Sequence, residues 1–228
     1  MDQDEETTMG DRLTMRTRLR RMPALAGDLP SFVPEALPPD PVDLFLSWFE
    51  QAVDAGVPEP HAVTLATAGA DGAPSSRVVV LKDVREGAFE FATDRRSRKA
   101  RDLDVNPRGA LSFYWQPQGR QVRVAGPVRA LDAVLSAQDY LARSPASRAA
   151  ALATCPGERL GSATELAEAI ERARERVDAE PGLVLPEWVV YSLVPDEVEL
   201  WQGSPTRAHV RVLYRRDGQG WTHRLEWP

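Results

Sequence analysis

Two lysines stand out in a chain whose other basic residues are all arginines. The sequence holds 28 basic residues, and only Lys82 and Lys99 among them are lysines. They share one short stretch with Arg77 and Arg98. Lysine carries a compact charge on a flexible stem, whereas arginine presents a rigid planar fork. This set indicates a site for an anion such as phosphate, with a solvated charged turn as the alternative for residues 95–99.

A second candidate set lies near the C-terminus. Arg207, His209 and Arg211 recur at even spacing. On a single β-strand, even spacing places side chains on one face, where they can reach a common cavity. The pattern favours a functional site, with a solvent-facing histidine as the alternative.

The first set lies on a predicted β-hairpin. Residues 78–81 form a β-branched apolar run typical of a buried strand, which Arg77 precedes and Lys82 follows. A turn at Gly87 then leads to a second strand over residues 88–93. The hairpin would hold both cations at the ends of one strand.

A short helix is expected directly after this hairpin. Asp94 or Ser97 can cap it, so that Arg98 and Lys99 lie in its first turn. The helix dipole mildly disfavours cations at that end. Beside the unpaired N–H groups of a helix start, however, these two cations suit a bound phosphate.

The remaining pattern predicts an α+β fold with mostly antiparallel strands and helices in the connections. Asp40 suits the start of an amphipathic helix that Gly56 can end. Residues 131–178 have a helical pattern, in which Ser162 begins a capping box. Further strands are expected over residues 61–67, 110–115, 121–128, 188–193, 197–201 and 209–214. Such an order of strands is typical of a β-barrel.

Composition excludes several functional classes. The net charge of −6 argues against a nucleic-acid partner. The single cysteine, Cys155, excludes an intramolecular disulfide and a cysteine-based zinc site, and no metal is expected. No apolar run is long enough to span a bilayer, and the acidic start of the chain has no secretory signal. We therefore expect a cytoplasmic protein without a membrane partner.

The chain is predicted to divide into two parts. Residues 1–38 combine an acidic start, a basic patch and a proline-rich connector, so we expect a flexible N-terminal arm. Residues 39–228 would form one domain, since 43% of the chain is hydrophobic and can build a core.

Four separated segments together resemble the FMN-dependent pyridoxamine/pyridoxine 5′-phosphate oxidases, including their relatives in phenazine biosynthesis. The segments are R-V-V-V-L-K (77–82), F-A-T…S-R-K-A (91–100), N-P-R…F-Y-W…R-Q-V-R-V-x-G (106–126) and L-W-Q-G…R-x-H-x-R (200–211). Each is weak alone, but their order and spacing are specific. The resemblance covers the chain from about Asp40 onward. It implies an FMN-binding split β-barrel that forms a homodimer, with each site between two subunits.

The resemblance also implies a role for individual residues. The positions implied to bind FMN, of which Arg77, Arg98 and Lys99 would hold its phosphate, are Arg77, Val78, Val79, Val80, Leu81, Lys82, Phe91, Thr93, Ser97, Arg98, Lys99, Gln121, Trp201 and Arg211. The positions implied to bind a phosphorylated substrate are Lys82, Tyr140, Arg143, Ser144, Arg148, Arg207 and His209. Within the second set, Arg207 and His209 would be catalytic.

The implied activity is oxidation of pyridoxamine or pyridoxine 5′-phosphate to pyridoxal 5′-phosphate, with oxygen as the electron acceptor. An oxidase of a phenazine-type precursor and a split-barrel protein that binds flavin or haem without turnover are the alternatives. Three departures from the family pattern leave the substrate open. Ser144 stands where the family has arginine, Val210 where it has an acidic or amide residue, and residues 154–157 where many relatives have a Gln-Ser pair.

Overall fold

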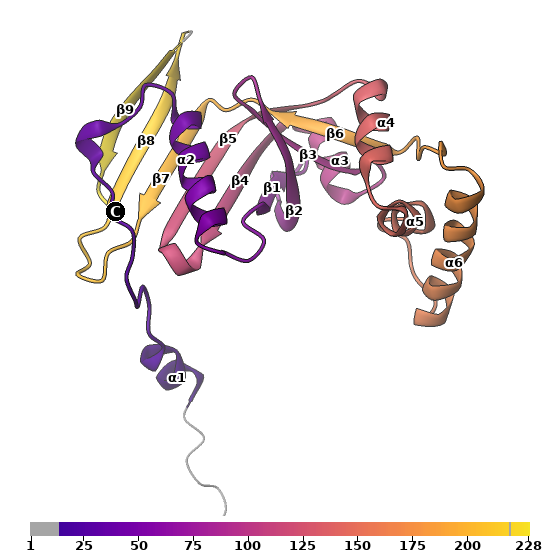
Figure 1. The fold of residues 1–228 in the computed structure, drawn as a ribbon, viewed down its shortest axis with the longest axis horizontal. Helices are drawn as coiled ribbons and strands as arrows, with labels where there is room; N and C mark the ends of the chain where they lie inside the picture. The colour runs from indigo at the N-terminus through magenta and orange to yellow at the C-terminus, as the bar shows by residue number, and fades with distance from the viewer. Residues whose placement is uncertain (1–13, 219) are drawn as a thin grey trace, which may run out of the picture.

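The protein, described here by a computed structural model over residues 14–218 and 220–228, is built around a closed antiparallel barrel (Figure 1). Six strands form the ring in the order β4-β1-β2-β3-β6-β5, and β4 pairs with β5 to close it. Their bounds are β1 (Ala62–Ala68), β2 (Pro74–Arg85), β3 (Ala88–Asp94), β4 (Arg108–Trp115), β5 (Arg120–Ala130) and β6 (Trp188–Leu193). Beyond β5 the sheet continues through β7 (Glu197–Gln202), β8 (Val210–Asp217) and β9 (Gly220–Glu226). The predicted α+β split-barrel fold is confirmed.

Six α-helices are found among the described residues, and α2, α3 and α6 begin at caps that the sequence predicts. They are α1 (Met15–Arg21), α2 (Pro41–Asp54), α3 (Arg98–Val105), α4 (Ala133–Ala142), α5 (Pro145–Ala153) and α6 (Ala163–Ala179), with two 3₁₀ turns, η1 (Pro34–Ala36) and η2 (Gln116–Gln118). Asp40 accepts from the Val42 amide, and Ser162 accepts from the Glu165 amide. None of the described helices is long and apolar enough to cross a membrane.

Helices α5 and α6 project from the barrel as a separate lobe (Figure 1). The lobe has a small core of its own, formed by Ala149, Ala173 and Val177. The predicted helical region therefore folds as three helices, of which α4 contacts β6 while α5 and α6 contact each other.

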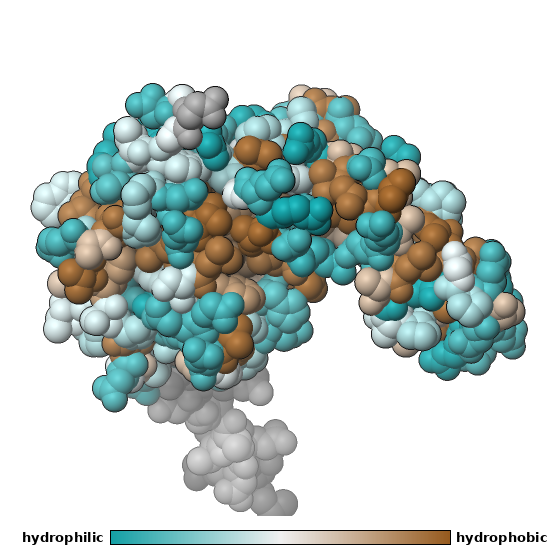
Figure 2. Space-filling view, turned by 45° about the horizontal axis from the view of Figure 1, so that its top comes forward, coloured by the Kyte–Doolittle hydropathy of each residue, from teal (hydrophilic) through white to brown (hydrophobic). Residues whose placement is uncertain are grey.

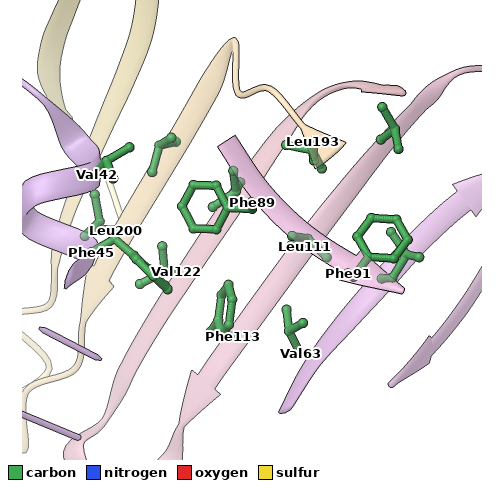
Figure 3. Close-up of a cluster of buried hydrophobic side chains, with 14 of the residues drawn as sticks. Val42, Phe45, Val63, Phe89, Phe91, Leu111, Phe113, Val122, Leu193 and Leu200 are labelled. Atoms are coloured by element: carbon green, nitrogen blue, oxygen red, sulfur yellow. The ribbon is translucent and has the colours of Figure 1, made fainter. Parts of the chain in front are cut away.

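Aromatic side chains fill the interior of the barrel (Figure 3). Phe45 of α2 is fully buried, and its ring centroid lies 4.9 Å from that of Phe89 and 5.0 Å from that of Phe113. Such pairs add about 0.5–1.5 kcal/mol each beyond the area that they bury. Because side chains fill this barrel, ligand sites must lie on its outer face or at its ends.

The prediction that residues 78–81 form a fully buried strand is wrong. In β2, Val78 and Val80 are 67% and 47% exposed, whereas Val79 and Leu81 pack against the core. Strand β2 follows the two-residue alternation of a sheet with one solvated face. Its outward positions are also β-branched and apolar, so the sequence does not reveal the alternation of exposed and partly buried residues.

The described part of the N-terminal arm contacts helix α2 and strand β8. The rings of Phe32 and Trp48 meet edge to face at 5.1 Å, and the Tyr214 hydroxyl donates to the Pro38 carbonyl at 3.0 Å. Burial raises the pKa of Tyr214 to about 12. Residues 1–13 of the arm lie outside the described residues, and the flexibility of the arm stays a prediction.

Candidate active site

One cluster of cations includes Arg77, which lies near the start of β2. Arg77 donates to the hydroxyls of Thr67 at 2.8 Å and Ser75 at 2.7 Å. Thr67 in turn donates to a buried carboxylate oxygen of Asp102 at 2.7 Å, and that oxygen lies 3.9 Å from Arg77. These contacts hold the Arg77 guanidinium in one orientation, between a neighbouring strand and helix α3.

Helix α3 brings two further cations to Arg77. Lys99 donates to the Thr93 hydroxyl at 3.0 Å, and its pKa is lowered by burial and by the charge of Arg77. Arg98 in turn contributes to lowering the pKa of Arg77, after the larger effect of burial. Three cations thus act on one another, with the carboxylate of Asp102 near Arg77 and that of Asp94 near Lys99. An anion would relieve their repulsion, so this cluster fits a terminal phosphate group.

The N-terminus of α3 supports the same interpretation. Ser97 is the N-cap residue, but its side chain makes no capping hydrogen bond and lies 3.5 Å from the Thr93 hydroxyl. Asp94, the other predicted cap, accepts instead from the Arg96 amide and pairs with its guanidinium. The helix start therefore presents its N–H groups without a side-chain cap, an arrangement that suits an anion.

A second group of predicted residues forms a row across the outer face of the sheet. Tyr114 of β4 pairs with Gln121 of β5, Gln121 pairs with Trp201 of β7, and Trp201 pairs with Arg211 of β8. Residues directly opposite each other in a sheet share one face. Three residues predicted to line a flavin ring therefore lie side by side, and the exposed Tyr114 extends their row.

Arg211 has a buried hydrogen-bond donor that no acceptor among the described residues satisfies. Its Nε atom is buried without a hydrogen bond and lies 3.9 Å from the carboxylate of Glu199. Glu199 also faces Arg123 at 3.6 Å. A buried donor left unpaired costs about 1–3 kcal/mol. A flavin ring has hydrogen-bond acceptors and takes up electrons, so its chemistry suits a position beside this unpaired donor.

Arg207 and His209 lie in a turn, so their predicted placement on one strand is wrong. Strand β8 begins at Val210, and Arg207 has the left-handed φ of +69°. The Arg207 amide donates to the Ser204 carbonyl, which closes the turn. The Ser204 amide donates to Nδ1 of His209 at 3.0 Å, so Nε2 carries the proton of the neutral ring. The His209 ring lies 5.0 Å from Trp201 and adjoins the outer row.

A buried arginine holds the start of this turn. Arg120 donates to the side chains of Gln202 and Gln51, both at 2.9 Å, and lies over the Trp48 ring. Burial lowers its pKa to about 10. Gln202 donates onward to the Gly203 carbonyl at 3.1 Å. The network links α2, β5 and β7 to the segment that carries His209.

Lys82 lines a separate pocket of about 270 Å³ between the β2–β3 hairpin and α4. Its ammonium lies 3.0 Å from Asp139, whose other oxygen accepts from the Trp188 indole at 2.8 Å. Glu90 lines the same pocket, and burial raises its pKa. Lys82 is thus paired with an acid that we did not predict.

The other predicted substrate-binding residues lie on α4 and α5, where they make contacts within the chain. The Tyr140 hydroxyl donates to the Arg148 carbonyl, and Arg148 donates to the carbonyls of Pro181 and Leu183. Ser144 caps α5. These contacts hold the helices together. A substrate role for Tyr140, Ser144 and Arg148 stays a prediction.

The remaining predicted positions divide between the core and the surface. Phe91 is fully buried and stacks on Tyr191, so its side chain packs the core. Val78 and Val80 face outward on the same strand as Arg77. Among the described residues no group of His, Cys, Asp and Glu could hold a metal ion.

One chain does not bring all these groups together. In Figure 1 the turn between β7 and β8 lies at the left of the barrel, whereas α4, which lines the Lys82 pocket, lies at the right. Arg207 and His209 are therefore remote from Lys82 in the same molecule. A site that uses both sets requires a second chain.

Sequence comparison decides the family. The family model described as pyridoxamine 5′-phosphate oxidase matches residues 49–201, and the model of the pyridoxine 5′-phosphate oxidase C-terminal dimerisation region matches residues 188–228. The chain belongs to the pyridoxamine 5′-phosphate oxidase family. It is 45% identical over 188 residues to a pyridoxine/pyridoxamine 5′-phosphate oxidase of Burkholderia cenocepacia, covering 81% of this chain and 87% of the relative. The counterpart in Bordetella pertussis is 43% identical over 192 residues, covering 83% and 90%.

Two solved structures extend the comparison to the fold. PhzG from Burkholderia lata, in complex with tetrahydrophenazine-1-carboxylic acid, superposes with a TM-score of 0.82 at 29% identity, covering 89% of this chain and 100% of PhzG. A pyridoxamine 5′-phosphate oxidase-related FMN-binding protein from Nostoc punctiforme gives a TM-score of 0.68 at 22% identity, covering 82% and 97%. The second likeness supports the split-barrel fold alone.

The acids of this family member were the residues that sequence reasoning missed. Asp102 lies one helical turn after Arg98, but its contacts are with Thr67 and Arg77 on two strands, which no spacing along α3 indicates. Asp139 directly precedes Tyr140, but nothing in the sequence pairs it with Lys82. Glu199 gave no signal, because an acid on an outer strand face is ordinarily solvated.

The cation cluster generates a prediction for cofactor binding. Lys99→Gln should weaken FMN binding about 10–100-fold, because it removes a charge-assisted contact of about 1.5–3 kcal/mol. Riboflavin, which lacks the phosphate, should bind both proteins alike. Fluorescence titration of the apoprotein measures both affinities. Arg95→Gln, which removes an exposed cation just before α3, is the control. Equal weakening of FMN and riboflavin would contradict a phosphate role for Lys99.

Proposed function

We propose that this family member is an FMN-dependent oxidase that converts pyridoxamine or pyridoxine 5′-phosphate to pyridoxal 5′-phosphate in the cytoplasm, with oxygen as the electron acceptor. The observation that carries the proposal is the cluster of Arg77, Arg98 and Lys99 at the start of α3. The cluster is compact enough for one phosphate group. Relatives 43–45% identical to this chain bear the name of that oxidase.

The proposal assigns the cofactor to residues of two clusters. Arg77, Arg98 and Lys99 would hold the FMN phosphate, while Trp201 and Arg211 of the outer row would contact the ring. Bound FMN supplies a two-electron acceptor that oxygen regenerates. Arg211 would stabilise the negative charge that develops on the acceptor, because its Nε has no other hydrogen-bond partner.

The substrate would lie between the Lys82 pocket and the β7–β8 turn. Lys82 would receive the phosphate of the substrate, and Arg207 with His209 would orient its reacting end. Because His209 Nδ1 accepts a hydrogen bond from the Ser204 amide, Nε2 carries the proton of the neutral ring. Nε2 would therefore be a hydrogen-bond donor toward the substrate. Positioning of this kind lowers the barrier by removing translational and rotational freedom before reaction.

This arrangement requires a homodimer. The two sets of substrate residues are remote within one chain, so the partner subunit would supply one of them. Exposed apolar residues on the outer barrel face, namely Val78, Val80 and Tyr114, provide surface for the contact. Figure 2 shows apolar residues gathered over the middle of the molecule and on the projecting lobe.

Oxidation of a phenazine-type precursor is the second candidate. Two observations favour it, namely the pairing of Lys82 with Asp139 and the serine at position 144 in place of arginine. Both reduce the positive charge available to a substrate phosphate. PhzG, whose complex contains a tetrahydrophenazine carboxylic acid, is similar in fold over its whole length.

A direct assay tests the proposal. The purified protein should be yellow, release FMN rather than FAD on denaturation, and consume oxygen with pyridoxine and pyridoxamine 5′-phosphates. A yellow protein without oxygen uptake on either compound would reject the substrate and keep the cofactor. A protein that stays colourless after incubation with FMN would reject both.

The dimer has its own test. The holoprotein should sediment as a dimer of the 25.2 kDa chain. Val78→Arg should shift it toward monomer and lower its FMN content, because a charge would enter the apolar contact. Val53→Arg, at a 46% exposed position on α2, serves as the control and should remain dimeric. A monomer with full FMN occupancy would contradict a site composed of two chains.

The two arginines near the C-terminus should separate in function. Arg207→Ala should keep bound FMN but lose roughly two to four orders of magnitude in kcat/KM, as when a positioning group of about 3–5 kcal/mol is removed. Arg211→Ala should instead weaken FMN retention, and added FMN should partly restore activity. Loss of flavin from Arg207→Ala, or an unchanged rate, would refute this division.

A further inference from the structure

The Lys82 pocket contains a fixed carboxylate beside its lysine. One oxygen of Asp139 lies 3.0 Å from the Lys82 ammonium, and the other accepts from the Trp188 indole at 2.8 Å. Only 20% of the Asp139 side chain and 27% of the Lys82 side chain are exposed. Both carboxylate oxygens are engaged, so the acid is held in place beside the cation.

Arg143 is the second cation next to this carboxylate. Its guanidinium lies 4.1 Å from the centre of the Trp188 ring, and its Nη1 atom is buried without a hydrogen-bond partner. Burial lowers the pKa of Arg143, and the charge of Asp139 partly offsets that effect. Two cations and one acid leave this cluster with a single net positive charge. A phosphate monoester carries about −1.5 to −2 at pH 7, whereas a carboxylate carries one negative charge.

The other charged residues of the pocket do not add positive charge. Arg85 also lines it, but pairs with Glu90 at 3.1 Å and with Asp83 at 3.4 Å. All three of these side chains line the pocket, and together they carry one net negative charge when both acids are ionised. Asp139 is the acid that contacts Lys82 directly, so it most directly offsets the positive charge that a ligand meets there.

We propose that Asp139 is a specificity-determining residue that reduces the preference of this pocket for a phosphate dianion over a singly charged or uncharged group. The inference rests on the proposed function, in which Lys82 receives the charged end of the substrate. A phosphate that contacts Lys82 would lie close to the Asp139 carboxylate. Like charges repel more strongly in a partly buried site than in water, and the repulsion is smaller for a carboxylate and absent for an uncharged group.

Removal of the acid should restore selectivity for phosphate. Asp139→Asn keeps the size of the side chain and removes its charge. We expect the variant holoprotein to bind pyridoxal 5′-phosphate roughly tenfold more tightly than the wild type does, since a like-charge contact is lost. Pyridoxal, which lacks the phosphate, should bind both proteins with the same Kd. Isothermal titration calorimetry measures both ligands directly and does not depend on turnover.

Two further variants isolate the effect. Asp132→Asn removes one charge at the other end of α4, where asparagine can still cap the helix through the Leu135 amide, and should change neither Kd. Lys82→Met in the Asp139→Asn background should abolish the gain, because the gain depends on the freed lysine. Thermal melting and FMN content check the folding of each protein, and Asp139→Ser replaces Asp139→Asn if the latter is unstable.

The outcomes separate this inference from the proposed function. Unchanged or weaker binding of pyridoxal 5′-phosphate by the variant overturns the inference, since Asp139 would then orient Lys82 toward phosphate. Absence of binding by both proteins also overturns it. A tenfold gain without oxidase activity on pyridoxine 5′-phosphate would support the role of Asp139 and reject the proposed reaction.

Discussion

The filled interior of the barrel is the constraint on which the rest of the molecule depends. Phe45 of α2 packs against Phe89 and Phe113, and all three side chains are fully buried, so side chains rather than a ligand fill the interior. Chemistry can therefore take place only on the outer face, where strands present alternate residues, or at the strand ends, where helices begin. An outer face is open to solvent in one chain. A reaction that must exclude water needs a second surface to cover such a face, and the proposed site between two chains would supply one.

A common pattern of charge links the three clusters. Each places a carboxylate close to a cation, namely Asp102 beside Arg77, Asp139 beside Lys82, and Glu199 near Arg211. An isolated cation in a partly buried position would lose hydration without compensation. The nearby carboxylates lower that cost in the free protein. The same acids also limit affinity, because a bound anion must lie near them. Stability of the unliganded chain and affinity for phosphate thus oppose each other.

Local patterns predicted the elements well, while tertiary contacts decided the partners. The cap at Asp40, the β2–β3 hairpin and the cations at the start of α3 all follow from short-range rules, and the structure contains each of them. The exposure of Val78 could not be predicted, because a β-branched residue suits either face of a strand. The Lys82–Asp139 contact joins residues 57 positions apart on a strand and a helix, and no periodicity encodes such a pair. Sequence therefore predicted where cations gather but not the acids that lie beside them.

The turn between β7 and β8 corrects the geometry that the sequence predicted for Arg207, His209 and Arg211. Even spacing placed Arg207, His209 and Arg211 on one strand, yet the strand begins only at Val210. A left-handed φ at a non-glycine residue such as Arg207 costs about 1–3 kcal/mol and persists only where the surroundings enforce it. Here the enforcing contacts are the Ser204–Arg207 turn and the hydrogen bond from Ser204 to His209. A strand would fix all three side chains to the sheet surface, whereas a closed turn lets Arg207 and His209 project beyond it. In the proposed dimer, this placement would let the two side chains reach a substrate that the other chain holds.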